Sequence, residues 1–236
     1  MLPQAYVYPK GMRETRDLLR RRTFLVRRRA EALTHLQNTN SQYNLPPFAK
    51  KLAYAANRDE LAIPQRFADP SVKKNVEVDL ALIDAYDRQI RDLELYLTRA
   101  AKVDDPQAYH RLRSVPGIGP VLALVLLYEI HDVRRFPEVG DFLSYARLVR
   151  CAHESAGKKQ GTGGRKIGNA HLKWAFSEAA CLFLRGSAPA QRWLARRQKK
   201  HGKARALGAL SARLGRAVYH LLRKREAFDA KRFFAS

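Results

Sequence analysis

The sequence contains little that could cross-link the chain covalently or insert it into a membrane. It has two cysteines in 236 residues, Cys151 and Cys181, and without a second pair neither a zinc site nor a disulfide framework is indicated. We expect both thiols to be reduced and buried. The longest apolar run, residues 121–128, is far shorter than the ~18 residues of a transmembrane helix, and the first residues lack the charged start of a signal peptide. The sequence therefore predicts a cytoplasmic protein.

Acidic residues are also scarce. The chain has 45 Lys and Arg against 22 Asp and Glu, a formal net charge of +23. Residues 156–236 hold twenty basic and three acidic side chains and residues 10–29 hold nine and two, whereas residues 72–105 hold six and eight. Lys and Arg displace condensed counterions from a phosphate backbone, so this surplus favours a nucleic acid as partner. An acidic membrane surface would attract the same charge, but the sequence has no segment that could span it, and we expect no membrane partner.

Proline and glycine are absent from residues 72–101, where a helix is predicted. Asp69-Pro70-Ser71 would start this helix and Asp104-Asp105-Pro106 would end it. An earlier helix over residues 12–37 repeats apolar residues every seven positions and is a candidate partner. Two arrangements stay open, a helical hairpin within one chain and a coiled coil that forms a homo-oligomer. The apolar residues of the later helix recur at spacings of three and four, which is typical of a coiled-coil seam: Ile83, Tyr86, Ile90, Leu93, Leu97 and Ala100.

Two segments flank the earlier helix. Residues 38–69 are rich in Asn, Gln and Pro and are expected to form an irregular connection with at most a short helix. At the N-terminus, Ala5-Tyr6-Val7-Tyr8 is bounded by prolines and is predicted to form one strand. Because a lone strand is not stable without a sheet to join, it looks like the last strand of a domain whose earlier part is missing.

A turn with two glycines precedes the apolar helix that is predicted over residues 121–130. In residues 112–120, Gly117-Ile118-Gly119 follows the pattern of a helix-hairpin-helix motif. Two glycines allow a tight turn and a close approach of the backbone, and the amides at the start of the next helix can receive a phosphate. Such a contact positions the chain without reading base sequence. A plain turn between two packed helices would use the same residues, but with this net charge we predict that Gly117 and Gly119 contact a phosphate.

The segment from residue 151 to residue 169 is predicted to be a flexible cationic loop. No Gly-Lys step in it is followed by the Ser or Thr that a P-loop needs, so ATP binding is not expected. The loop suits a strand of nucleic acid laid along cations and bare amides. Ser155, at its leading edge, is either a turn serine or a nucleophile, which would need a base or a metal to remove its proton. Residues 157–169 hold five glycines and four cations, which are Lys158, Lys159, Arg165 and Lys166.

The last third of the chain is predicted to be helical. Residues 169–184 are apolar nearly all round, as in a buried central helix, and amphipathic basic helices follow over residues 190–200 and 204–225. Cations of such helices often form a solvated face, but their density here favours a patch that binds the nucleic-acid backbone. The densest cluster consists of Arg196, Arg197, Lys199 and Lys200.

In this order the motifs resemble the DEDD insertion-sequence transposases of the IS-one-ten and IS-eleven-eleven type, some of which are guided by a bridge RNA. The resemblance covers essentially the whole chain, and the combination of motifs is specific although each alone is weak. Residues 5–9 and 38–47 look most like the IS-eleven-eleven branch. The C-terminal likeness is carried by residues 112–120, Arg135-Phe136-Pro137, Glu154-Ser155-Ala156-Gly157-Lys158 and residues 166–173.

The resemblance implies an enzyme that binds, cleaves and transfers DNA strands. Family members carry a RuvC-like nuclease fold in which four carboxylates hold Mg²⁺, then a coiled coil, then a domain with a serine nucleophile. That serine is implied to attack a DNA phosphodiester, and it falls on Ser155 in this sequence. The family's carboxylates all precede the N-terminal strand, so they cannot be carried over to this chain. Four aspartates on the coiled-coil helix do not replace them: Asp79, Asp84, Asp87 and Asp92.

The expected fold is therefore mainly α, in three parts. Residues 1–69 would be a remnant of the RuvC-like domain with the Arg-rich helix and its connection, and residues 70–105 the coiled-coil helix. Residues 106–236 would be the C-terminal transposase domain, with the helix-hairpin-helix-like motif at 112–130 and the serine loop at 151–169. We expect a truncated chain that is inactive by itself. Its expected partners are DNA and a second copy of the chain, and the resemblance adds a guide RNA as a further candidate. The alternative is a non-catalytic nucleic-acid-binding and dimerisation protein.

Overall fold

The structure, a computed structural model, describes residues 6–149, 154–155, 158–159 and 167–235. These residues are mostly helical, which confirms the expected mainly α fold. The chain divides into two compact units, residues 17–96 and residues 1–16 together with 97–236. In the part of the chain that is described, no helix is both long enough and apolar enough to cross a membrane.

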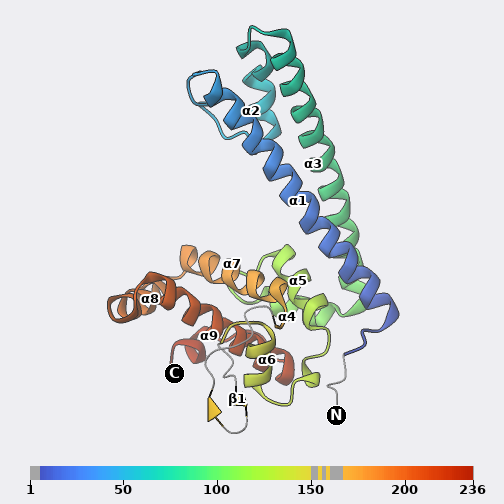
Figure 1. Cartoon of the computed structure of the whole chain (residues 1–236). Helices are drawn as coiled ribbons and strands as arrows, with labels where there is room; N and C mark the ends of the chain where they lie inside the picture. Colours follow the sequence, from blue (N-terminus) through green and yellow to red (C-terminus); the bar gives the residue numbers. More distant parts are fainter. Residues whose placement is uncertain (1–5, 150–153, 156–157, 160–166, 236) are drawn as a thin grey trace. The chain divides into compact units, whose positions relative to one another are not determined.

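The smaller unit, residues 17–96, is built on two long antiparallel helices. They belong to α1 (Lys10–Gln42) and α3 (Pro70–Asp104), which run side by side over this unit (Figure 1). Two arginine–carboxylate ion pairs and one histidine–carboxylate hydrogen bond join them. Their order along α1 is the reverse of their order along α3, as expected for antiparallel helices. The pairs are Arg22 with Glu94, Arg29 with Asp87 and His35 with Asp79, each at 2.5 Å.

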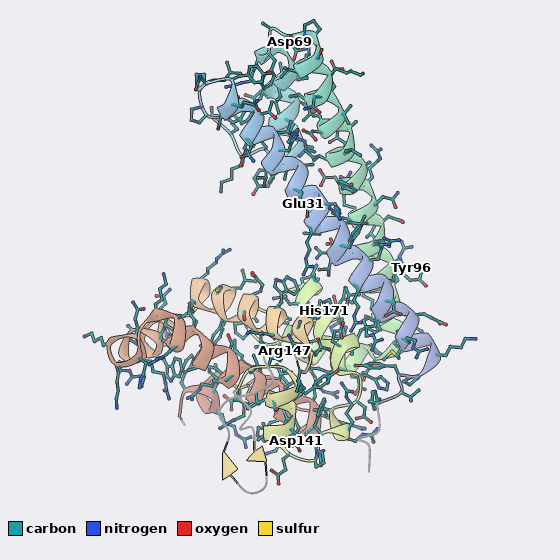
Figure 2. The ribbon with its side chains drawn as sticks, viewed as in Figure 1. Glu31, Asp69, Tyr96, Asp141, Arg147 and His171 are labelled. Atoms are coloured by element: carbon teal, nitrogen blue, oxygen red, sulfur yellow. The ribbon has the colours of Figure 1, made fainter. Side chains whose placement is uncertain are left out.

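The hairpin within one chain is thus the arrangement that the structure adopts. Ile83 and Ile90, two residues of the predicted seam, are buried in it with 0% and 9% exposure. Asp69 begins α3 as expected, because its carboxylate accepts the N–H groups of Ser71 and Val72 at 2.8 and 3.0 Å (Figure 2). A coiled coil between two chains stays a prediction.

The connection between the two helices closes the open end of this hairpin. It is mostly irregular, as predicted, with one short α-helix, α2 (Ala55–Glu60), and one 3₁₀ helix (Ile63–Arg66), while α1 continues to Gln42, five residues beyond the predicted end. Apolar side chains from the connection and from both long helices form one core cluster, which removes their surface from water. The cluster consists of Leu36, Leu52, Ile63, Phe67, Val76 and Ile83.

A buried arginine ties the connection to the hairpin. The Arg58 side chain is 3% exposed; it donates to the carboxylates of Asp84 and Asp87 at 2.7 and 2.8 Å and to the carbonyl of Leu52 at 2.9 Å. Asp87 also receives Arg29 at 2.5 Å, so one carboxylate bridges two arginines. Burial acts to raise the pKa of Asp87, but the hydrogen bonds from Arg29 and Arg58 outweigh it and lower the pKa below its ordinary value of 3.8.

The predicted N-terminal strand is wrong for residues 6–8, while Ala5 lies outside the described residues. Tyr6, Val7 and Tyr8 are not in a strand, since no neighbouring strand in the described part of the chain offers hydrogen bonds to them. Side chains hold the segment instead. The hydroxyl of Tyr8 donates to the carbonyl of Glu129 at 2.8 Å, and the hydroxyl of Tyr6 hydrogen-bonds the ring of His131.

The larger unit is a helical domain in which α7 packs against α5, α8 and α9. Every residue of α5 from Leu122 onward is buried, as its apolar sequence predicts. The helix α7 is less uniform than predicted, because its outer face exposes Trp174 and Cys181. The expectation that Cys181 is buried is therefore wrong, and Cys151 lies outside the described residues. The helices are α4 (Pro106–Arg113), α5 (Pro120–Ile130), α6 (Val139–Tyr145), α7 (Ala170–Gly186), α8 (Ala188–His201), α9 (Lys203–Lys224) and α10 (Ala230–Ala235).

The turn between α4 and α5 lies directly against α7. Gly117 has a φ of +86°, and a Cβ there would be 2.5 Å from the backbone nitrogen of Phe183 and 2.7 Å from the carbonyl oxygen of Ala179. Only glycine combines this conformation with this close approach. Gly119, two residues later, has an ordinary φ of −77°, and a Cβ there would meet no described atom within 4 Å.

Replacing Gly117 with Ala is expected to lower the free energy of unfolding by at least ~2 kcal/mol, because a left-handed backbone and an overpacked contact both oppose the methyl group. Gly119→Ala is the matched control and should change stability by less than about 1 kcal/mol. Urea unfolding followed by circular dichroism measures both. Equal stability of the two variants would contradict the packing role of Gly117.

The smaller unit is expected to lose stability in acid. Asp87 has a lowered pKa when folded, so its contribution is present above the ordinary pKa of 3.8 and is lost as the pH falls through the lower folded value. Urea unfolding between neutral pH and strong acid should therefore show a fall in stability below about pH 4. Asp87→Asn should be less stable at neutral pH and should have a weaker fall. Asp92→Asn, an exposed residue on the same helix, is the control, and an Asp87→Asn variant with an unchanged acid profile would contradict this account.

Candidate nucleic-acid interface and serine loop

The two ends of the serine loop are joined by a short backbone stem. The N–H of Asn169 donates to the carbonyl of Tyr145 at 2.6 Å, and the guanidinium of Arg147 donates to the carbonyl of Ile167 at 2.9 Å. Gly168 has a φ of +91°, and a Cβ there would be 2.5 Å from the carbonyl oxygen of Tyr145. The chain can therefore leave α6 and return to α7 at nearly the same point. Figure 2 labels Arg147, which follows α6, and His171, which lies in the first turn of α7.

Within the loop the structure describes a minimal two-stranded ladder. The strands β1 (Glu154–Ser155) and β2 (Lys158–Lys159) are antiparallel, and Ser155 pairs with Lys158. The loop was predicted to be a flexible cationic loop, and this pairing was not part of the prediction. Arg165 and Lys166, two of the four predicted loop cations, lie outside the described residues.

Buried hydrogen bonds of Asn169 form a network that connects the stem to the helices α5 and α7. Glu129, on the apolar helix α5, is 1% exposed, and its carboxylate accepts the side-chain amide of Asn169 at 2.7 Å. The amide oxygen of Asn169 caps α7 by accepting the N–H groups of His171 and Leu172 at 2.9 and 3.1 Å. Sequence reasoning missed Glu129 because a carboxylate in an apolar helix has no visible partner along the chain. Asn169 could have been found, since an Asn before a helical segment is a strong N-cap signal.

An arginine surrounded by aromatic rings completes the network. The guanidinium of Arg135 lies 4.2 Å from the ring centre of Tyr6 and 4.7 Å from that of Tyr145, and it donates to the hydroxyl of Tyr8 at 3.3 Å. Burial raises the pKa of Tyr8 to about 12, so its hydroxyl stays protonated. For Tyr145, burial acts to raise the pKa, but hydrogen bonds from Asn169 and Arg135 outweigh it and lower the pKa. Such cation–π contacts stabilise a desolvated cation, so the turn before α6 is rigidly anchored.

The two glycines predicted to contact phosphate differ in what surrounds them. Gly117 faces the backbone of α7, so its conformation is explained by packing. Gly119 is the residue before α5, no side chain among the described residues caps that helix start, and the space in front of Gly119 is open. Gly117 therefore shapes the turn, whereas contact of Gly119 with a phosphate stays a prediction.

The predicted cations of α8 all lie on the surface. Arg196, Arg197, Lys199 and Lys200 are exposed, and the guanidinium of Arg197 lies 4.9 Å from the ring centre of Trp193. This contact orients one cation of the cluster, and long side chains such as the others extend into solvent. The helix thus presents a cationic face to any polyanion.

The described residues do not fit a Mg²⁺ site of the kind that the resemblance implies. Within residues 6–149, 154–155, 158–159 and 167–235, no group of three or more His, Cys, Asp or Glu side chains is arranged to hold a metal ion. The residues in these ranges are therefore assigned no role toward that ion.

Comparison with known protein families identifies the central part of this unit. Residues 109–196 match the family described as the IS116/IS110/IS902 family of transposases. The matched range contains α5, α6 and α7, the whole serine loop with its stem, and the part of α8 that ends at Arg196.

Curated relatives extend the similarity over most of the chain. The transposase for insertion sequence element IS1111A of Coxiella burnetii is 24% identical over 225 residues, which are 91% of this chain and 60% of that protein. A protein of the mini-circle element IS117 of Streptomyces coelicolor is 33% identical over 132 residues, 52% of this chain and 30% of the relative. A protein of insertion element IS116 of Streptomyces clavuligerus is 26% identical over 189 residues, 74% of this chain and 44% of the relative.

This chain therefore spans 60% or less of the length of these relatives. The family match encloses the serine loop and its buried support: residues 109–196 match the IS116/IS110/IS902 family of transposases, and the chain is similar over most of its length to the transposase of IS1111A.

Proposed function

We propose that this chain is a DNA-binding part of an insertion-element transposase and carries its serine nucleophile. The observation that carries the proposal is that the family match covers the serine loop together with the stem that closes it. Three relatives come from insertion elements, and the one from Coxiella burnetii is named a transposase. The residue at the front of the loop, Ser155, is the candidate for covalent chemistry.

DNA would be held by cations on two parts of the larger unit. The exposed side chains of α8 would neutralise backbone phosphates, and the open helix start at Gly119 would receive one more phosphate on its amides. In the serine loop, Lys158, Lys159, Arg165 and Lys166 would accompany the strand that is attacked. Contacts of this kind set the position of the DNA and supply affinity, but they do not select a base sequence.

The proposed reaction transfers a phosphodiester to the protein without net hydrolysis. The hydroxyl of Ser155 loses its proton as its Oγ forms a bond to phosphorus. The bond from phosphorus to the leaving sugar oxygen breaks, and that oxygen takes up a proton to become a hydroxyl, so no proton is gained or lost overall. A hydroxyl from another strand can reverse the step and receive the phosphate, which frees the serine. A cation near the attacked phosphate would oppose its charge, and Lys158, the backbone partner of Ser155 in the ladder, is the candidate for that role.

Binding to DNA is expected to depend steeply on salt. If about 6–10 phosphates are contacted, affinity should fall by roughly 10³–10⁵ between 50 and 200 mM salt. Changing Arg196, Arg197, Lys199 and Lys200 together to Ala should weaken binding and reduce the salt slope by roughly one for each phosphate that the variant no longer neutralises. Fluorescence anisotropy with labelled duplexes of unrelated sequence measures both, and a flat salt response would rule the proposal out.

Formation of a covalent protein–DNA adduct distinguishes the proposed transposase part from a non-catalytic nucleic-acid-binding protein. This chain alone should give no protein–DNA adduct, with or without Mg²⁺, because the resemblance assigns the metal carboxylates to the part of the relatives that the chain does not span. A fusion that adds the remaining part of the IS1111A transposase, with any cognate RNA, should give an adduct visible on a denaturing gel.

Ser155→Ala in the same fusion should abolish the adduct and leave DNA affinity nearly unchanged, since one hydroxyl adds little to an electrostatic contact. An adduct that persists in Ser155→Ala would refute the nucleophile. A fusion that binds DNA yet never forms an adduct would favour the alternative, a non-catalytic nucleic-acid-binding protein.

A further inference from the structure

The helices α9 and α10 and the segment between them line an open cavity that the sequence did not predict. Its volume is about 220 Å³. Arg216, His220 and Lys224 reach it from α9, where they are spaced four residues apart and so lie on one face of the helix. Arg232 reaches it from α10. All four side chains are exposed, so the mouth of the cavity is cationic.

The cations that line this cavity outnumber the carboxylates that line it. Four Lys or Arg side chains and two carboxylates line it, which leaves an excess of two positive charges. One of the carboxylates, Asp229, is occupied in accepting the N–H groups of Lys231 and Arg232 at 2.8 and 3.2 Å. The other, Glu226, is 3.8 Å from the guanidinium of Arg232.

The pKa of His220 reflects this excess. Burial lowers it first, and the neighbouring charges of Lys224, Arg216 and Arg232 lower it further. The same holds for the pKa of Arg213 on the cavity wall, which burial, Arg197 and Arg216 all lower. An anion in the cavity would relieve this repulsion among the cations.

The inner wall of the cavity is apolar and aromatic. Leu221 and Phe233 are buried there, Ala217 lines the α9 side, and the ring of Phe228 is half-buried. The rings of Phe228 and Phe233 are 5.3 Å apart, so their edges and faces form one aromatic surface. Unstacked bases are commonly held on such surfaces, because every base has a π face.

The cavity also adjoins the cationic helix α8. The guanidinium of Arg197 lies 4.9 Å and that of Arg213 lies 5.6 Å from the ring centre of the same residue, Trp193. Arg213 is held in place by donating to the carbonyl of Phe233 at 2.9 Å. A strand whose phosphates follow α8 could therefore continue toward the cavity mouth without leaving the positive surface.

We propose that this cavity binds one unstacked nucleotide, with its phosphate on Arg216, Lys224 and Arg232 and its base on the aromatic wall. The assignment rests on the proposed nucleic-acid binding and adds a specific subsite to it. Ligand pockets for larger molecules are about 300–1,000 Å³, so a cavity of about 220 Å³ suits a single base. The nucleotide can be free or part of a single strand, and the experiment separates these sources.

The probe is a short single-stranded oligonucleotide that carries one 2-aminopurine, whose emission falls when its base stacks. With the parent chain, binding should quench this emission. Ala227→Trp fills the cavity from an exposed lining residue, and it should abolish the quenching and weaken binding roughly tenfold, as the removal of one base-stacking interaction does. Ala217→Leu, which fills the cavity from α9, should act in the same direction.

Removal of the phosphate contacts is tested by a double variant. Arg216→Ala with Lys224→Ala should weaken binding and reduce the salt slope by about two. Its matched control is Arg99→Ala with Lys102→Ala, an exposed pair at the end of α3 that removes the same charge, and quenching should persist there. A free 2-aminopurine mononucleotide then replaces the oligonucleotide. The protein should quench its emission only if the cavity binds free nucleotides as well as single strands.

The outcomes separate this subsite from the wider proposal. In one outcome, the parent binds the oligonucleotide while the cavity variants show the same affinity and the same quenching as the control variant, Arg99→Ala with Lys102→Ala. That result refutes the subsite and leaves the proposed nucleic-acid binding intact. If the parent binds no nucleic acid at all, both are refuted. Circular dichroism confirms that each variant is folded, and agreement between Ala227→Trp and Ala217→Leu distinguishes a filled cavity from a local distortion.

Discussion

The buried hydrogen bond between Glu129 and Asn169 constrains the part of the larger unit from which the serine loop emerges. It joins α5 to the start of α7, while the backbone N–H of the same asparagine reaches the end of α6. A buried carboxylate is costly unless its oxygens are satisfied, so the pairing restricts how these three helices can meet. The serine loop begins and ends at this junction. Its anchor points are therefore held by the core of the unit, even though its sequence is rich in glycine.

Charge is handled differently in the two units. In the smaller unit Arg22 and Arg29 of α1 pair with carboxylates of α3, and Arg58 is buried between Asp84 and Asp87. These pairs neutralise part of the positive charge within the hairpin and give Arg22, Arg29 and Arg58 a structural role. In the larger unit the cations of α8 and α9 have few acidic neighbours, since residues 156–236 include three acidic side chains. This excess is the part of the charge that can serve a polyanionic partner.

The two glycines of the turn between α4 and α5 differ in their surroundings. Gly117 is required by the backbone of α7, and its left-handed φ would be needed whether or not a phosphate were bound. Gly119 leaves open space before an uncapped helix start in the described structure, where an anion can approach. Packing therefore explains the conformation of Gly117, and the role of Gly119 in phosphate binding remains a prediction.

The sequence by itself determined the local elements, because capping and periodicity act over a few residues. Asp69 and the apolar spacing that includes Ile83 define α3, and the long apolar run defines α5. Tertiary structure alone decided that residues 6–8 are held by side chains rather than in a strand, and that Cys181 faces outward. It also decided the partner of Glu129, forty residues away, and the cavity between α9 and α10. These features depend on which surfaces meet across the fold, and hydrophobic contact is non-directional, so spacing along the chain does not specify them.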